Sequence, residues 1–200
     1  IIDYGMGNLN SVLKKINKIS GNVLITSSPE ELQQASKIIL PGVGHFSKAV
    51  NNIKQLGLWE VLNEMVLVKK TPILGICLGM QLMAKSSEEG NVDGFGWFDA
   101  EVVKFKVSDK IKFKVPHMGW NTIEVKKQSK LTENLPLSPE FYFVHSYHIK
   151  SYNVSEVLAN TIYDYEFASA LEKDNIFGVQ FHPEKSHDIG EKLLTNFLNL

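Results

Sequence analysis

The sequence predicts an α/β fold with a central, mostly parallel β-sheet and helices on both faces. Three observations indicate it. Apolar strands alternate with helical stretches in the first half of the chain, one apolar run ends at a lone cysteine between glycines, and 200 residues suit one domain with a sizeable core. We therefore expect a single domain over residues 1–200, to which the middle third adds a small antiparallel sheet.

The expected elements follow from the spacing of the apolar residues. Strands are predicted at 1–4, 22–26, 37–40, 72–76, 122–125, 141–144, 156–163, 166–171 and 176–181. Helices are predicted at 9–19, from 29, at about 46–56, at 58–69, after Cys77 and at the C-terminus, where an amphipathic helix ends the chain. The strand–helix alternation of the first half requires parallel strands, because a helix returns the chain to the starting edge of the sheet.

The segment 103–115 has a different pattern. Apolar residues alternate with lysines on both sides of Ser108-Asp109, which predicts a β-hairpin with one lysine face. Such a face is either a solvated surface that resists aggregation, or a docking surface for an acidic partner or a phosphorylated substrate.

The amino-acid composition argues against several kinds of partner and of functional site. All 21 basic side chains are lysines, so anions must be held by Lys, His or backbone N–H groups. The net charge of −1 gives no reason to expect a nucleic acid or an anionic membrane as partner, and no apolar run reaches the roughly 18 residues that span a bilayer. The single cysteine excludes an intrachain disulfide and a multi-cysteine metal site, and it fits a reducing cytoplasm. The chain begins at Ile1 without a methionine, which is consistent with a trimmed N-terminus.

The lone cysteine is the leading candidate for a nucleophile. Cys77 lies in Gly75-Ile76-Cys77-Leu78-Gly79, between a predicted strand and a predicted helix. This is the pattern of a nucleophile elbow, in which glycines permit a tight turn and the helix N-terminus favours the thiolate. The alternative is a buried structural cysteine, unless a base lies elsewhere in the chain.

His182 is the best placed of six histidines to be that base. It ends the apolar strand 177–181, and functional groups gather at the carboxyl ends of strands in α/β sheets. Pro183 favours an extended conformation at His182, so Glu184 projects to the same side and can orient the imidazole.

Several motifs together resemble the class I (triad) glutamine amidotransferases, and more narrowly the glutaminase subunits of imidazole glycerol phosphate synthase. The matching segments cover nearly the whole chain in order. They are 2–8 (IDYGMGN), 40–44 (LPGVG), 75–81 (GICLGMQ), 115–121 (VPHMGWN), 142–147 (YFVHSY) and 181–186 (FHPEKS). The resemblance implies a flavodoxin-like three-layer sandwich, and a Cys77-His182-Glu184 triad that hydrolyses glutamine without a metal or cofactor. It also implies a heterodimer with a cyclase subunit, which uses the ammonia in histidine biosynthesis to make imidazole glycerol phosphate and AICAR.

Other residues are candidates for holding the substrate. The N–H of Leu78 is an expected oxyanion donor, and the glycine-rich loop Gly42, Val43 and Gly44 is the expected source of a second, although this loop is also an ordinary way to end a strand. Gln81 follows Cys77 by one helical turn and is expected to meet the substrate. Glu89 resembles the family's ligand for the α-amino group, or else is an exposed charge. Polar groups near the substrate carboxylate are expected from His145, Ser146 and Tyr147, or these are simply the polar tip of a strand.

The partner is the open question at this stage. By resemblance, the residues facing the synthase are Asn8, Met118, Trp120 and Lys185, and local core packing is the alternative. Asn10 replaces an arginine that is common in the family, so a related synthase that amidates surface sugars stays an alternative recipient of the ammonia. A catalytically idle regulatory subunit and a stand-alone hydrolase of γ-glutamyl peptides are further alternatives. The presence of Cys77, His182 and Glu184 argues against an idle regulatory subunit. The Trp120 segment, which resembles a partner-binding surface, argues against a stand-alone hydrolase.

Overall fold

The computed structural model describes residues 1–200. Its helices are α1 (Leu9–Ile19), α2 (Pro29–Leu32), α3 (Phe46–Gln55), α4 (Leu58–Asn63), α5 (Leu78–Leu82) and α6 (His187–Leu198), with a π-helix η1 (Glu64–Val68) and 3₁₀ turns η2 (Val154–Glu156) and η3 (Pro183–Lys185). Its strands are β1 (Ile38–Gly42), β2 (Ile73–Cys77), β3 (Ser86–Ser87), β4 (Val92–Asp93), β5 (Ala100–Lys104), β6 (His117–Thr122), β7 (Glu124–Val125), β8 (Glu140–His145), β9 (Tyr147–Ser151), β10 (Val157–Tyr163), β11 (Tyr165–Lys173) and β12 (Ile176–Val179).

Three parallel strands form the part of the sheet that carries the site. The order along the large sheet is β1-β2-β12-β11-β9-β5-β3-β4, and β2 pairs in parallel with both β1 and β12. All residues of these three strands are buried, as expected for a parallel sheet covered on both faces. Gly42 pairs with Cys77 at their common carboxyl edge, so two of the segments expected at the site end side by side.

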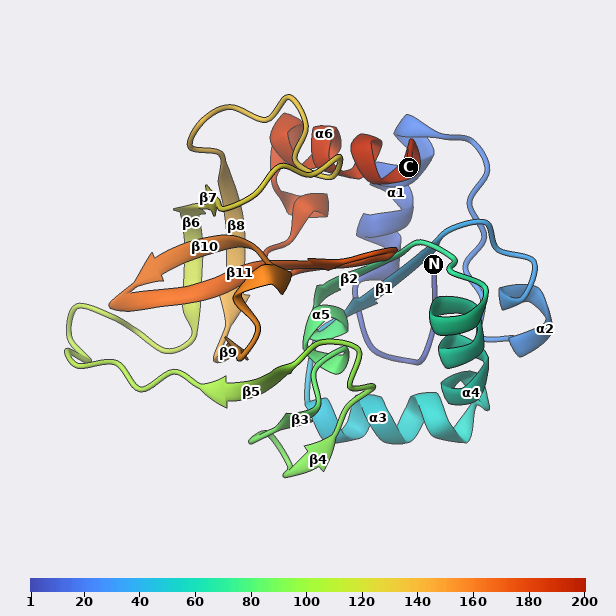
Figure 1. The fold of residues 1–200 in the computed structure, drawn as a ribbon, viewed down its shortest axis with the longest axis horizontal. Helices are drawn as coiled ribbons and strands as arrows, with labels where there is room; N and C mark the ends of the chain where they lie inside the picture. The colour runs from blue at the N-terminus through green and yellow to red at the C-terminus, as the bar shows by residue number, and fades with distance from the viewer.

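Helices cover both faces of this sheet (Figure 1). The apolar residues of α3 and α4 join one buried cluster, and those of α1 and α6 join the other. The amphipathic spacing in the sequence explains this arrangement, because each helix buries one apolar stripe against the sheet. The prediction of an α/β sandwich with helices on both faces and a small antiparallel addition is confirmed. The central sheet, expected to be mostly parallel, is mixed, with β1, β2 and β12 as its parallel part.

The antiparallel part extends the sheet and adds a separate ribbon. Strands β11, β9 and β5 pair antiparallel beyond β12, while β10 pairs with β11 and β7. Strands β6 and β8 form a two-stranded sheet of their own, in which His117 pairs with His145.

One secondary-structure expectation is wrong, and a second is refined. The segments at 1–4 and 22–26 form only one isolated bridge, between Ile2 and Thr26, because the chain pairs there for too short a length to be a strand. The expected helix at 58–69 changes to a π-helix after Asn63.

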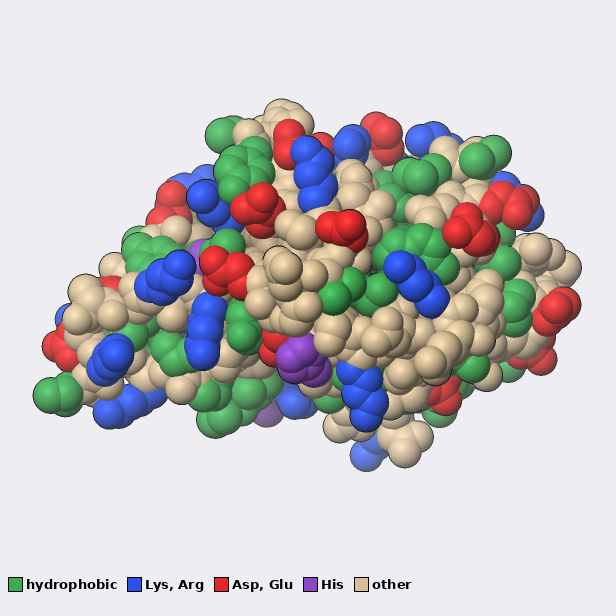
Figure 2. All heavy atoms as spheres, turned by 90° about the horizontal axis from the view of Figure 1, so that it is seen from below, with side chains coloured by type: hydrophobic (Ala, Val, Ile, Leu, Met, Phe, Trp, Pro, Cys, Tyr) green, Lys and Arg blue, Asp and Glu red, His purple; other side chains and the backbone are tan.

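The lysine hairpin is also absent. The arms between β5 and β6 are irregular and bond to the turn between β10 and β11 instead of to each other. Ser108 Oγ donates to Asp164 at 2.7 Å, and Tyr163 Oη donates to the Lys114 carbonyl at 2.6 Å. Tertiary contacts therefore override the alternating pattern. Figure 2 shows lysine side chains standing out between apolar ones at the left end of the molecule, where Figure 1 shows this loop.

Candidate active site

Cys77 occupies a strained turn between β2 and α5. Its φ is 54° and its ψ is −109°, a conformation that L-residues rarely adopt. Backbone strain of this kind occurs at functional sites, where it exposes a nucleophile at the top of a strand. The side chain is 6% exposed and is not in a disulfide.

The two flanking glycines let the helix sit directly on the strands. A Cβ on Gly79 would collide with the Leu40 carbonyl of β1, and a Cβ on Gly75 would come within 2.7 Å of the backbone at Gly79. Close approach of α5 to β1 and β2 is therefore the reason for glycine at both positions.

His182 and Glu184 lie together beside the elbow. His182 Nδ1 is 2.7 Å from Glu184 Oε1, and both side chains are nearly fully buried. The other ring nitrogen, Nε2, is buried without a hydrogen-bond partner, and Cys77 lies close enough to His182 to raise the pKa of the ring. Because Nδ1 is occupied by the carboxylate, Nε2 is the atom available for proton transfer.

The electrostatics favour a charged imidazole. Burial opposes the charge on His182, but hydrogen bonds and charges from Cys77 and Glu184 outweigh burial and raise the pKa of His182 to about 9. The His182 imidazole therefore carries a proton near neutral pH.

A pocket of about 520 Å³ opens onto the sulfur. Most of the residues predicted from the sequence to hold substrate or oxyanion line it, together with Pro116 and Val144. They are Val43, Gly44, Leu78, Gln81, Glu89, His145, Ser146 and Tyr147. The tertiary structure thus gathers segments from five separate parts of the chain around Cys77.

Comparisons with known proteins agree with this geometry. A family model described as glutamine amidotransferase class-I matches residues 1–200. The imidazole glycerol phosphate synthase subunit HisH 2 of Methanococcus maripaludis is 52% identical, over 99% of this chain and 97% of that protein. Subunit HisH 1 of Campylobacter jejuni is 49% identical, over 100% of this chain and 98% of that protein. The chain belongs to the HisH family of class I glutamine amidotransferases. A crystal structure of a glutamine amidotransferase, 18% identical, has the same fold with a TM-score of 0.78, covering 99% of this chain and 96% of that one.

The amidotransferase has two candidate sources of oxyanion donors at the pocket. Leu78 is the first residue of α5, so its N–H has no partner within the helix. Gly44, with a φ of 117°, ends the 42–44 loop on the other side of the pocket. A Cβ on Gly44 would lie 2.7 Å from Met6 Cε, so a larger residue would collide there. The positive φ also favours glycine, because L-residues rarely adopt it.

Glu89 and Tyr147 lie together at the pocket. One Glu89 oxygen accepts from the Phe46 N–H at 2.8 Å and so caps α3, which leaves the other oxygen for a ligand. Burial and the charges of Glu89 and Glu88 raise the pKa of Tyr147, so its hydroxyl stays protonated as a donor. Glu89 is therefore not simply an exposed surface charge, and only one of its two oxygens is used in capping α3.

Two predicted substrate contacts line the pocket but have their hydrogen-bond donors occupied within the protein. Gln81 is only 4% exposed, and its amide nitrogen donates to the Tyr147 carbonyl and to Gln180 Oε1. His145 has both ring nitrogens hydrogen bonded, to the Tyr147 carbonyl and to His117. Their donors are used inside the protein, so neither side chain offers a hydrogen bond donor to substrate.

The predicted partner-facing residues group around an exposed aromatic surface, except Asn8. Trp120 is 46% exposed and stacks on His187 with ring centroids 5.0 Å apart, while Met118 is 61% exposed. Lys185 Nζ lies 5.5 Å from the Tyr142 ring. Core packing is thus not the role of this surface. Asn8 caps α1 by accepting from the Ser11 N–H.

Sequence reasoning missed two residues near Cys77. Gln180 Nε2 lies 3.6 Å from Cys77 Sγ, and Gln180 belongs to the short segment between the end of β12 and His182. The buried Tyr4 hydroxyl lies beneath Gly42 without a hydrogen-bond partner, and burial and the nearby Cys77 raise its pKa.

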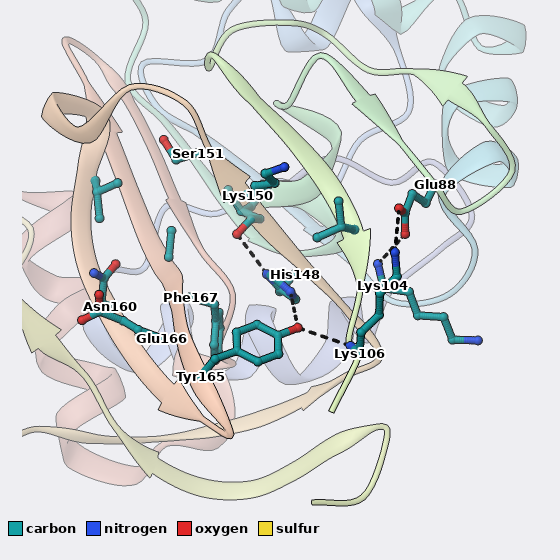
Figure 3. Close-up of a pocket in the computed structure, with 14 residues that line it drawn as sticks. Glu88, Lys104, Lys106, His148, Lys150, Ser151, Asn160, Tyr165, Glu166 and Phe167 are labelled. Carbon is teal, nitrogen blue, oxygen red and sulfur yellow. Dashed lines mark hydrogen bonds and ion pairs between the residues drawn. The ribbon is translucent and has the colours of Figure 1, made fainter. Parts of the chain in front are cut away.

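A second pocket, of about 530 Å³, lies where β9 and β11 separate. Figure 3 shows His148 there, held between the Ile149 carbonyl and Tyr165 Oη, with Lys104 pointing away. The ring has no free nitrogen and no nucleophile beside it, so this pocket is not a candidate active site.

The buried histidines give the stability a defined pH dependence. Burial lowers the pKa of His117 from 6.5 to about 4, and it also lowers those of His145 and His148. The unfolded chain binds these protons at a higher pH than the folded chain, so the free energy of unfolding falls as the pH drops from about 6.5 towards 4. His182 acts oppositely, because its raised pKa adds stability that is complete below about 6.5 and lost as the pH rises through about 9.

We expect urea unfolding to give the highest stability near pH 6.5–7, with losses at pH 4.5 and at pH 9.5. His117→Phe should make the acid loss shallower, since one of the buried neutral rings no longer titrates. Equal stability at pH 4.5 and pH 7 would contradict the assignment of neutral buried histidines.

Proposed function

We propose that this chain hydrolyses the side-chain amide of L-glutamine at Cys77 and passes the ammonia to a cyclase subunit. The observation that carries the proposal is His182, which Glu184 holds at 2.7 Å on one ring nitrogen and whose pKa the nearby Cys77 raises. Cys77 in turn lines a pocket large enough for an amino acid. As a member of the HisH family, the chain is the glutaminase subunit of imidazole glycerol phosphate synthase in histidine biosynthesis.

In the first half of the reaction, the Cys77 thiolate attacks the amide carbon. The carbonyl oxygen becomes an oxyanion, which the N–H of Leu78 and an N–H of the 42–44 loop stabilise. His182 then donates its Nε2 proton to the amide nitrogen, the C–N bond breaks, and ammonia leaves a glutamyl thioester on Cys77.

In the second half, water replaces the thiolate. Neutral His182 takes a proton from water, the resulting hydroxide attacks the thioester, and glutamate leaves with Cys77 restored as a thiolate. Glu184 holds the ring in one tautomer through both steps. No metal or cofactor takes part in the proposed reaction.

The glutamine is held by the ends of the pocket. We assign its α-amino group to the free oxygen of Glu89 and its carboxylate to backbone and hydroxyl donors at Ser146 and Tyr147, since the chain has no arginine to grip it. The surface around Trp120, Met118 and Lys185 is proposed as the docking site for the cyclase, because exposed aromatic residues and Met are typical of interface centres.

Two organisational points complete the proposal. We treat residues 1–200 as one amidotransferase domain. We also propose the cytoplasm as its compartment, because the chemistry requires Cys77 to stay reduced; in the structure, no helix is long and apolar enough to cross a bilayer.

The test is ammonia release from glutamine, measured for the chain alone, with a cyclase subunit, and with the cyclase and its nucleotide substrate. Strong stimulation by the loaded cyclase supports the proposal. A cyclase that binds without stimulating refutes the histidine role, and stimulation by a sugar-amidating synthase alone would assign the ammonia to that recipient.

A further inference from the structure

A line of buried polar side chains runs from the partner-facing ribbon to the nucleophile, and the reaction steps above do not use it. Its members are each 6% exposed or less, namely Gln81, His117, His145 and Gln180. Burying polar groups costs free energy unless each is hydrogen bonded, so the direction of every bond in the line can be traced.

The Tyr147 carbonyl fixes these directions. It accepts from Gln81 Nε2 at 3.0 Å and from His145 Nδ1 at 2.7 Å. A carbonyl can only accept, so the Gln81 amide must present its nitrogen here and the His145 ring must carry its proton on Nδ1.

From this carbonyl the line leads to the sulfur. Gln81 Nε2 also lies 3.0 Å from Gln180 Oε1, so the Gln180 oxygen faces Gln81 and its nitrogen faces the other way. That nitrogen, Nε2, is 3.6 Å from Cys77 Sγ. The orientation of Gln180 is therefore set by its neighbour, and an N–H points at the nucleophile.

In the other direction the line enters β6. Neutral His145 accepts at Nε2 from His117 Nδ1 at 3.1 Å, and His117 Nε2 in turn lies 3.3 Å from Asn121 Nδ2. Residues alternate along β6, so His117 points inward while Met118 and Trp120 are exposed on the opposite side. One strand thus carries both the proposed docking residues and the far end of the line.

We propose that Gln180 is a positioning residue for the nucleophile, whose side-chain amide, oriented by Gln81 and anchored through Tyr147 to His145 and His117, holds the Cys77 thiolate in place and stabilises it. The inference rests on the proposed glutaminase function and adds a residue to that same site. A hydrogen bond to a charged acceptor is stronger than one to a neutral acceptor, so the N–H acts most on the thiolate.

The competing interpretation is that Gln180 only satisfies Gln81 in the core. Its loss would then lower stability but leave the thiol unchanged. Because Cys77 is the only cysteine in the chain, alkylation by iodoacetamide measured against pH reports this one thiolate, whether or not the chain turns over glutamine.

The experiment compares Gln180→Glu and Gln180→Met with wild type. Gln180→Glu keeps an acceptor for Gln81 but puts a carboxylate oxygen where the N–H faced the sulfur, so its charge also acts on the thiol. Gln180→Met keeps the length, removes both bonds and adds no charge, so it is the decisive variant. We expect a higher apparent pKa for alkylation in both and a kcat lower by about 10–100-fold, with KM little changed.

Gln81→Met, a change in α5, should also raise the apparent pKa for alkylation of Cys77. Combining it with Gln180→Met should raise that pKa little further, because Gln81 acts through Gln180. Tyr165→Phe is the matched control, since it removes a hydroxyl bonded to His148 outside this line. An unchanged alkylation profile in folded Gln180→Met, or a raised KM at normal kcat in Gln81→Met, would overturn the proposal. If wild type shows no glutaminase activity, that result counts against the proposed function. The effect of Gln180 on the Cys77 thiol can still be measured by alkylation in that case.

Discussion

Cys77→Ala is expected to lower the kcat for glutamine hydrolysis by about 10⁴-fold or more, because no other side chain at the pocket can form the thioester. Alanine removes only the sulfur and leaves the turn with a Cβ, so the fold should persist. Glutamate release at saturating glutamine, with the cyclase present, measures the loss, and circular dichroism checks the fold.

The matched comparison is His182→Ala, alone and combined with Cys77→Ala. Groups that act as one unit lose nearly all activity when either is removed, so the double variant should be no slower than Cys77→Ala alone. Additive losses would mean that His182 works independently of Cys77. Substantial turnover by Cys77→Ala would refute the nucleophile assignment.

Glu184→Gln is expected to lower kcat by about 10⁴-fold without unfolding the chain. The carboxylate accepts the Nδ1 proton of His182 at 2.7 Å, whereas an amide can present an N–H there and so stabilise the wrong tautomer. Removing its charge also removes one cause of the raised pKa of His182. The alkaline limit of the pH–rate profile should therefore move below about 9.

Glu191→Gln is the control for this variant. Glu191 pairs with Lys18 at 2.7 Å on the surface of α6, where an ion pair contributes little. Its kcat and pH profile should match wild type. A Glu184→Gln enzyme with normal kcat would show that Glu184 does not orient the ring.

The elbow and the His-x-Glu pair could be found from the sequence because both are local. Glycines on either side of Cys77 permit a tight turn, and the proline after His182 restricts the backbone there. His182 itself is extended as predicted, but Glu184 lies in the 3₁₀ turn η3, so a local turn and not strand alternation brings the two side chains together. Parallel strands then bring the ends of β1, β2 and β12 to one edge, and the strand–helix order of the first half already required this of β1 and β2.

The absence of the lysine hairpin and the occupied donors of Gln81 could not be predicted from the sequence for a common reason. The alternation at 103–115 is a true local pattern, but Asp164 and Tyr163 bind the backbone and side chains that a hairpin would have paired. Gln81 is on the expected face of α5, yet its donor is taken by Tyr147 and Gln180, which lie 66 and 99 residues away along the chain. The pattern of neighbouring residues in the sequence does not show which distant group will take a given hydrogen-bond donor or acceptor.

The sequence by itself determined the α/β architecture, the nucleophile and its base, because helix and strand periods and turn glycines act over short distances. Only the tertiary structure decided which polar side chains near Cys77 are free for substrate and which are already hydrogen bonded. His145 and Gln81 belong to the second group, and Gln180 joins them with its N–H towards the sulfur. The physical reason is that a buried donor takes the nearest acceptor in space, whatever its place in the chain.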